Sequence, residues 1–206
     1  MITSAQALER LREGNRRFIA RLESRNLEQE HSRRLELVVE QAPIAIVLGC
    51  SDSRVPAELV FDQGLGDLFV IRVAGNIAAP SQIESIEIAA QQFGTPLVVV
   101  LGHSQCSAVT ASVDEQMKPV EMRSSSVGVI VKTIQPSVRA VLDSQPGLDR
   151  QALVCASIRE NVRGTVKRIK AGSDVLEKLL DQGQLHIVGA EYSLETGAVK
   201  FMEESS

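Results

Sequence analysis

The chain of 206 residues has no tryptophan and a single tyrosine, and only 3% of its residues are aromatic. Proteins that bind single-stranded nucleic acid stack bases on aromatic side chains, and this chain offers few of them. Its 22 Lys and Arg are outnumbered by 26 Asp and Glu and are spread among them, so no basic segment is available for phosphate contacts. We therefore expect no nucleic-acid partner.

Long hydrophobic runs are also missing. The longest apolar stretches, residues 42–50 and 96–102, are far shorter than the roughly 20 residues that a membrane-spanning helix needs. The N-terminus becomes charged at Glu9 and Arg10 and has no apolar segment typical of a secretory signal. We therefore expect a cytoplasmic protein with no membrane partner.

Cysteine is scarce as well. Three cysteines are an odd number, and without an export signal they indicate free thiols or metal ligands rather than a disulfide framework. Seven prolines and 14 glycines leave no low-complexity tract, and 44% hydrophobic with 23% charged residues is ordinary for a globular chain. We expect one domain over residues 1–206 with an aliphatic core.

Two β-branched runs that end in glycine, residues 43–49 and 96–102, have the pattern of strands buried on both faces. Such strands are typical of parallel sheets. A further strand is predicted at 67–73 and a helix at 81–93. Beyond residue 125 two periodic helices are expected, one from Val127 and one through 158–169. A short helix that an Asp174–Glu177 pair caps follows from 174, then a strand at 185–189 and a possible edge strand at 198–202. This alternation predicts an α/β fold, a mostly parallel central sheet flanked by helices.

The first residues of the chain predict an amphipathic helix. Residues 4–25 carry leucines and a phenylalanine at helical spacing among Arg and Glu, and Thr3 or Ser4 is the expected cap. We expect residues 1–40 to form an N-terminal helical arm that packs on a partner subunit.

Polar and metal-binding side chains follow the two most apolar predicted strands. Cys50, Asp52 and Arg54 come after the first strand, and His103 and Cys106 come at the end of the second. In open α/β sheets the ligand site lies beyond the carboxyl ends of the strands, so neighbouring strands would bring these side chains together. Two thiolates and one imidazole suit a tetrahedral zinc ion.

Three protein ligands leave a fourth position open, which is the arrangement of catalytic zinc sites. The remaining candidates to close it are Cys155, His186 and His31. Cys155 lies in an apolar stretch of a predicted helix and is interpreted as a core residue. His186 lies in a predicted strand and is interpreted as structural, and His31 lies in a charged stretch with no metal-site pattern.

The pattern C-x-D-x-R at residues 50–54, followed about fifty residues later by H-x-x-C at 103–106, resembles the signature of β-class carbonic anhydrases. The segment RVAGN at 72–76 resembles the same family, and the similarity covers about residues 4–202. The resemblance implies a sheet with four parallel strands and one Zn²⁺ per subunit near a dimer interface. It also implies carbon dioxide and bicarbonate as substrates, and a homodimer or a dimer of dimers.

The resemblance further implies roles for individual residues. Cys50, His103 and Cys106 would hold the zinc, and a zinc-bound hydroxide would hydrate carbon dioxide. Asp52 and Arg54 resemble the catalytic dyad of the family: Asp52 orients the hydroxide, and Arg54 keeps Asp52 away from the metal. In a closed state Asp52 would itself bind zinc as the fourth ligand.

Four residues match positions that contact substrate in the family: Gln41, Phe69, Ala74 and Ser107. Gln41 matches an amide that donates to a substrate oxygen, and Phe69 matches an aromatic wall of the pocket. Ser107 stands where the family usually has glycine, and Ile88 stands where it often has Tyr or Phe.

These departures leave two alternatives on the same scaffold, which are a hydrolase of carbonyl sulfide or carbon disulfide and an inactive zinc-binding homologue. A nucleotide-binding α/β domain was the remaining possibility, suggested only by Gly64-Leu65-Gly66. It fails because these glycines precede a predicted strand, whereas a phosphate-binding loop follows one.

Overall fold

The computed structural model describes residues 2–21, 33–34, 37–38, 41–122 and 128–202. Its centre is a five-stranded sheet with the order β2-β1-β3-β4-β5. Strands β1 to β4 are parallel, and β5 pairs with β4 in the antiparallel direction. In chain order the strands are β1 Ala45–Gly49, β2 Leu68–Arg72, β3 Leu97–His103, β4 His186–Tyr192 and β5 Val199–Phe201. The predicted α/β fold with a mostly parallel sheet is confirmed.

The two central strands owe their position to their apolar sequence. Every residue of β1 and of β3 is buried. Because side chains alternate along a strand, Ala45 and Val47 face one hydrophobic cluster and Ile46 and Leu48 face the other. A strand that must be covered on both faces fits the middle of an α/β sheet, where helices lie on each side.

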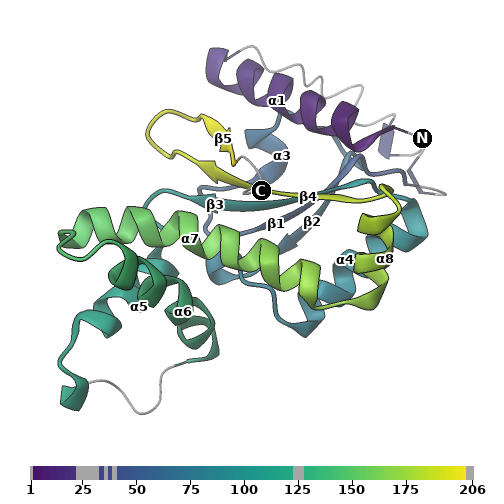
Figure 1. Ribbon diagram of the computed structural model, residues 1–206. Helices are drawn as coiled ribbons and strands as arrows, with labels where there is room; N and C mark the ends of the chain where they lie inside the picture. The colour runs from purple at the N-terminus through teal and green to yellow at the C-terminus, as the bar shows by residue number, and fades with distance from the viewer. Residues whose placement is uncertain (1, 22–32, 35–36, 39–40, 123–127, 203–206) are drawn as a thin grey trace.

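Helices cover both faces of the sheet (Figure 1). On one face lie α1 (Ser4–Ala20) and α3 (Ala57–Val60). On the other lie α4 (Pro80–Phe93), α7 (Arg150–Ala171) and α8 (Asp174–Asp181). The remaining helices are α5 (Ser107–Met117), α6 (Val129–Ser144) and the 3-10 turns η1 (Ala74–Asn76) and η2 (Val120–Met122).

Helices α5 and α6 pack with α7 around a third hydrophobic cluster. Ile134 and Val138 of α6 are buried there, as their spacing in the sequence predicted. The same cluster contains Cys50 and Cys106. Helices α5, α6 and α7 therefore build the apolar surroundings of the two cysteines. The first residue of this predicted helical pattern, Val127, lies outside the described residues.

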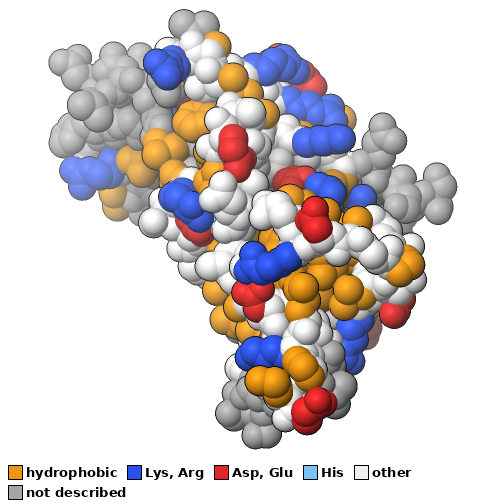
Figure 2. Space-filling model, turned by 90° about the vertical axis from the view of Figure 1, so that its left-hand side faces the viewer, with side chains coloured by type: hydrophobic (Ala, Val, Ile, Leu, Met, Phe, Trp, Pro, Cys, Tyr) orange, Lys and Arg blue, Asp and Glu red, His pale blue; other side chains and the backbone are white. Residues whose placement is uncertain are grey.

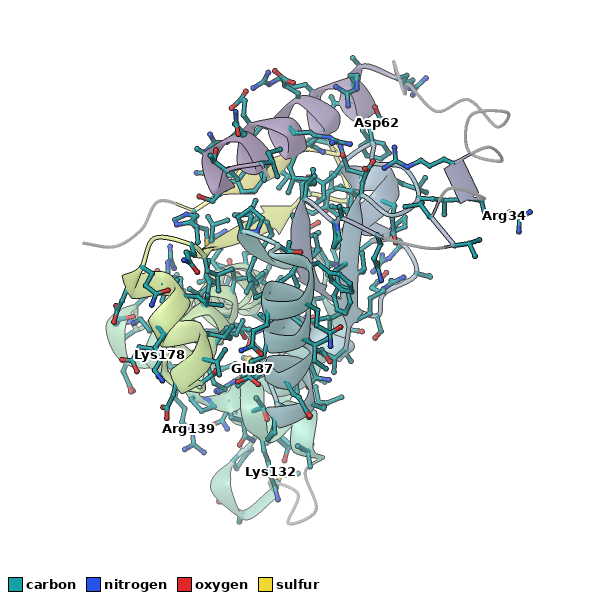
Figure 3. The ribbon with its side chains drawn as sticks, turned by 90° about the vertical axis from the view of Figure 1, so that its right-hand side faces the viewer. Arg34, Asp62, Glu87, Lys132, Arg139 and Lys178 are labelled. Carbon is teal, nitrogen blue, oxygen red and sulfur yellow. The ribbon has the colours of Figure 1, made fainter. Side chains whose placement is uncertain are left out.

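The helix ends differ from the predictions in two places. Helix α1 begins after Thr3, which caps it together with Gln6, but it ends at Ala20 because Arg21 adopts a left-handed φ of 55°. The predicted end near residue 25 was therefore too late. Helix α8 is capped by Ser173, which accepts from the Leu176 N–H, and not by the pair that begins at Asp174. The Ser173 hydroxyl also donates to Glu87, which lies on α4 where it faces α8 (Figure 3).

Helix α1 packs against its own chain. Ala7 and Leu11 are fully buried in the cluster on that face of the sheet. Near the carboxyl end of α1, Arg17 Nε lies 2.6 Å from a carboxylate oxygen of Asp62, close to the helix in Figure 3. The packing of a 1–40 arm on a partner subunit stays a prediction, and much of its second half lies outside the described residues.

On the face shown in Figure 2, positive and negative side chains are interspersed. This agrees with the mixed charge pattern of the sequence. Among the helices of the described residues, none is both long enough and apolar enough to cross a bilayer.

Candidate metal centre

The parallel pairing of β1 and β3 brings the predicted ligands together. Gly49, the last residue of β1, is paired with Leu101 of β3, so both strands end at the same edge of the sheet. Cys50 directly follows β1, His103 ends β3, and Cys106 precedes α5. One ligand atom from each residue lies within 4.8 Å of the other two, and all three residues are buried. The convergence predicted from the sequence is confirmed.

The loop between β3 and α5 turns sharply at Gln105, which has a φ of 57°. The turn places Cys106 at the N-cap position of α5. Backbone N–H groups of the first helical turn point toward this sulfur, and such groups favour an anion. The Cys106 side chain is therefore positioned to act as a thiolate beside a cation.

The imidazole of His103 is oriented by its own loop. Its Nδ1 lies 2.9 Å from the carbonyl oxygen of Ser104, a contact that requires Nδ1 to carry the proton. The other ring nitrogen, Nε2, is buried and has no hydrogen-bond partner among the described residues. A buried nitrogen with a free lone pair next to two sulfurs has the chemistry of a metal ligand.

The two sulfurs are strongly coupled. Contact with the Cys106 thiol, followed by His103 and the Gly75 N–H, lowers the pKa of Cys50 to about 4. The same contact, with burial, raises the pKa of Cys106. One thiolate therefore forms readily, and the second needs a positive charge nearby, because a buried anion is costly without one. This donor set fits a divalent, thiolate-binding ion such as zinc.

Asp52 and Arg54 form a two-pronged pair beside the cluster. Arg54 Nε lies 2.9 Å from Asp52 Oδ1, and Arg54 Nη2 lies 2.7 Å from Asp52 Oδ2. The Arg54 backbone N–H also donates to Oδ1 at 3.0 Å. These contacts hold the pKa of the Asp52 carboxyl well below its usual range. Asp52 is therefore an anion with both oxygens fixed in direction.

Three residues around the cluster, Gly75, Arg72 and Glu195, make hydrogen bonds that were not found from the sequence. The Gly75 N–H donates to Cys50 Sγ at 3.3 Å, and Arg72 donates to the carbonyl oxygens of Cys50 and Asp52 at 3.1 and 2.6 Å. Glu195 accepts from Ser104 Oγ and Gln105 Nε2 at 2.8 and 2.7 Å. The segment RVAGN was noticed for its resemblance, but no pattern in the sequence pointed to Glu195.

Two of the predicted substrate residues lie next to the cluster. Ala74 precedes Gly75, whose amide contacts the Cys50 sulfur, and Ser107 is the first residue of α5, directly after Cys106. Ser107 is exposed and Ala74 is half-buried. The contacts with substrate that were predicted for Ala74 and Ser107 stay predictions.

The other two predicted substrate residues are not brought to the cluster within one chain. Gln41 is exposed and precedes the amino end of β1, whereas Cys50 follows its carboxyl end. Phe69 lies toward the amino end of β2, and its ring centroid is 6.1 Å from that of Phe93 in α4. The contacts with substrate that were predicted for these two residues stay predictions.

The residues considered as fourth ligands lie elsewhere. His186 begins β4, at the amino end of the strand and thus at the opposite edge of the sheet from the cluster. Cys155 lies on α7 and is half-buried, so its interpretation as a core residue holds only in part. His31 lies outside the described residues. Within the described residues the candidate metal group consists of Cys50, His103 and Cys106.

Two cysteines and one histidine at the carboxyl edge of a parallel sheet form a candidate metal site of the kind that zinc enzymes of the α/β class contain. Comparison with known proteins gives the family. The family model described as carbonic anhydrase matches residues 45–199. The chain belongs to the carbonic anhydrase family, in its β class, and is a carbonate dehydratase.

Curated relatives cover nearly the whole chain. It is 38% identical over 191 residues to carbonic anhydrase 2 of Mycobacterium tuberculosis, which covers 93% of this chain and 89% of the relative. It is 39% identical over 194 residues to a carbonic anhydrase of Mycolicibacterium smegmatis, covering 94% and 91%. The resemblance predicted from the sequence is confirmed.

Solved structures give the same result. The β-carbonic anhydrase CcaA matches with a TM-score of 0.77 and 26% identity, and the match covers 95% of both chains. One of two tetrameric β-carbonic anhydrases from Sordaria macrospora shares the fold at 22% identity, with a TM-score of 0.68 over 85% of this chain and 88% of that one.

Proposed function

We propose that this chain catalyses the reversible hydration of carbon dioxide to bicarbonate and a proton at one zinc ion per subunit, bound by Cys50, His103 and Cys106. The observation that carries the proposal is the convergence of the three ligand atoms within 4.8 Å, with the lone pair of His103 Nε2 left free. Zinc bound there lowers the pKa of a water molecule and so supplies the nucleophile near neutral pH.

Asp52 would orient the attacking water. As an anion it accepts a hydrogen bond from the O–H, which aims an oxygen lone pair at the carbon of the substrate. Arg54 holds both carboxylate oxygens, so the acceptor cannot rotate away. The lowered pKa of Asp52 keeps this group ionised at neutral and alkaline pH.

Arg54 would have a second task. A carboxylate next to a zinc ion is itself a zinc ligand, and Asp52 would close the site if it turned toward the metal. Two hydrogen bonds from Arg54, together with the hold of Arg72 on the Asp52 carbonyl, oppose that rotation. The closed state, in which Asp52 is the fourth ligand, is therefore suppressed as long as the pair stays intact.

Substrate would bind between the cluster and the residues beside it. Ala74 and Ser107 would line this space, and the hydroxyl of Ser107 would narrow it relative to a glycine. Gln41 and Phe69 would take part only if a second copy of the chain supplied them, because they lie away from the cluster within one chain. This is one reason to propose a homodimer or a dimer of dimers, with the 1–40 arm packed on the partner.

The proposal is tested by zinc content and by stopped-flow hydration of carbon dioxide on the same preparation, at neutral and alkaline pH. One zinc per chain and a rate that rises above pH 7 are expected. Zinc without turnover would instead indicate an inactive homologue. Faster turnover of carbonyl sulfide or carbon disulfide than of carbon dioxide would make the chain a hydrolase of a carbon dioxide analogue. Ser107 and Ile88, which depart from the family pattern, are the reason to test this second activity.

A further inference from the structure

The turn that contacts the Cys50 sulfur has a left-handed backbone over two consecutive residues. Gly75 and Asn76 have positive φ angles, 71° and 45°, and both are buried. Glycine adopts this conformation without a steric penalty, and asparagine is one of the few other residues that adopt it. Because the turn is buried, contacts from other elements determine where its backbone groups point. The Gly75 N–H in this turn donates to Cys50 Sγ at 3.3 Å.

Helix α7 supplies a bond that holds this turn. Asn161 Nδ2 donates to the carbonyl oxygen of Gly75 at 2.8 Å, across a separation of 86 residues in the chain. Asn161 is 2% exposed, so water does not compete for the bond. The turn is also tightly enclosed: a Cβ on Gly75 would lie 2.7 Å from Ile134 Cδ1 and 3.2 Å from the Ala108 Cβ.

We propose that Asn161 is a positioning residue of the metal centre. It fixes the carbonyl of Gly75 and thereby keeps the N–H of the same residue on the Cys50 sulfur. An N–H donor reduces the charge that a thiolate gives to its metal and fixes the direction of the sulfur. The proposal rests on zinc binding at Cys50, His103 and Cys106, and it adds a residue from a helix that contributes no ligand.

The alternative is that Asn161 only satisfies a buried carbonyl. The same helix offers a comparison, because Thr165 lies one turn further along α7 and is equally buried, at 1% exposed. The Thr165 hydroxyl has no hydrogen-bond partner, so this residue shares the burial of Asn161 without the link to the sulfur. Loss of a buried hydrogen bond alone would lower the stability of an Asn161 variant without changing how the Cys50 sulfur binds a metal, whereas a positioning role would change the metal site as well.

The experiment compares Asn161→Asp and Asn161→Ala with Thr165→Val as the matched control. Asn161→Asp keeps the shape of the side chain but replaces the donating N–H₂ by an acceptor oxygen. We expect the zinc dissociation constant, measured by competition with a chelator, to rise about 10- to 100-fold in both Asn161 variants. Thr165→Val is expected to stay within about twofold of the wild type. Circular dichroism verifies folding in each case.

A spectroscopic measurement separates positioning from stability. With Co²⁺ in place of zinc, the thiolate-to-metal charge-transfer band is expected at longer wavelength in the Asn161 variants, because a sulfur that has lost its N–H donor gives up charge more easily. The band of Thr165→Val is expected at the wild-type position. Unchanged affinity and an unchanged band in Asn161→Asp would overturn the proposal.

A wild-type measurement keeps the test decisive if the variants do not fold. In ¹¹³Cd-loaded wild-type protein, the Gly75 amide proton is expected to show coupling to the metal through the N–H···S contact, and absence of the coupling would overturn the proposal. If wild-type protein instead binds no metal through the three ligands, the proposed zinc site itself fails. The two failures are thus distinguishable.

Discussion

The loop that follows β1 and the loop that follows β3 bring the same kind of ligand to one point, but they are held in different ways. The first loop is held by the end of β2 and by the turn that follows it. Arg72 donates to the carbonyls of Cys50 and Asp52, and the Gly75 amide donates to the Cys50 sulfur. Asn161 holds Gly75 in turn, so the exposed Arg72 and the buried Gly75 and Asn161 together determine where Cys50 lies.

The second loop is held by the turn between β4 and β5. Glu195, in the turn between β4 and β5, accepts from Ser104 and Gln105, and the Ser104 hydroxyl accepts from the Leu194 N–H at 2.9 Å. Glu195 is solvent-exposed, and contacts of exposed carboxylates contribute little to stability. The two ligand loops should therefore respond unequally when the residues that hold them are mutated, although both loops carry predicted metal ligands.

The largest effect is expected from the predicted cysteine ligands, of which each loop carries one. Cys50→Ser and Cys106→Ser each remove a thiolate from a three-ligand set, and both should lower zinc content toward zero and carbon dioxide hydration by roughly 100-fold or more. Metal analysis of the purified proteins and stopped-flow rates measure this. Cys155→Ser, on α7, is the matched control and should keep its zinc and its rate. A Cys50→Ser variant with full zinc would contradict the assignment of ligands.

The next effect concerns the first loop. Arg54→Ala should release Asp52 to turn toward the metal, so that zinc is retained while kcat/KM falls about 100-fold. The control is Arg150→Ala, because Arg150 holds Asp114 with the same two-pronged geometry at 2.7 and 2.9 Å on the surface away from the cluster. Wild-type rates in Arg54→Ala would show that Asp52 and Arg54 are not a catalytic pair.

A smaller effect is expected from the support of the first loop. Arg72→Met keeps the length of the side chain but loses both hydrogen bonds to the carbonyls of Cys50 and Asp52, so we expect kcat/KM to fall about 10-fold and zinc to bind more weakly. Stopped-flow kinetics and chelator competition measure the two changes. If Arg72→Met behaves like the corresponding change in the second loop, Glu195→Gln, the contrast between the loops is wrong.

The smallest effect is expected from the second loop. Hydrogen bonds from Ser104 and Gln105 lower the pKa of Glu195 from 4.5 to about 2. A carboxyl whose pKa is lowered by folding stabilises the protein above its unfolded pKa, and this contribution disappears as the pH falls toward the folded value. The wild type should therefore melt slightly above Glu195→Gln at pH 7, and the difference should shrink between pH 4.5 and pH 2. A difference that grows on acidification would contradict this.

Much of the architecture could be predicted from local patterns. The runs at 43–49 and 96–102 are strands because they are β-branched and apolar throughout, and such strands need cover on both faces. The ligands could be predicted because neighbouring parallel strands end at one edge of the sheet, which made Cys50, His103 and Cys106 converge. The errors lay at helix ends. The left-handed backbone of Arg21 ends α1, and the Ser173 side chain caps the start of α8.

The residues that hold the two ligand loops in place could not be predicted in the same way. Asn161 and Glu195 are ordinary polar residues, 86 and 90 residues away in the chain from the groups they contact. Nothing in their local sequence distinguishes them from solvated side chains. The positions of Gln41 and Phe69 also depend on geometry beyond the local pattern, since both lie toward the amino ends of the parallel strands β1 and β2, away from the cluster.

The sequence by itself determined the kind of chemistry, because thiolates, imidazole and a carboxylate paired with arginine carry their reactivity wherever they are placed, and the period of the apolar residues determined the strands that carry them. Only the tertiary structure decided how each ligand is held. Hydrogen bonds such as that from Asn161 to Gly75 depend on the packing of a helix across the sheet, and no local pattern records which residues that packing brings within 3 Å.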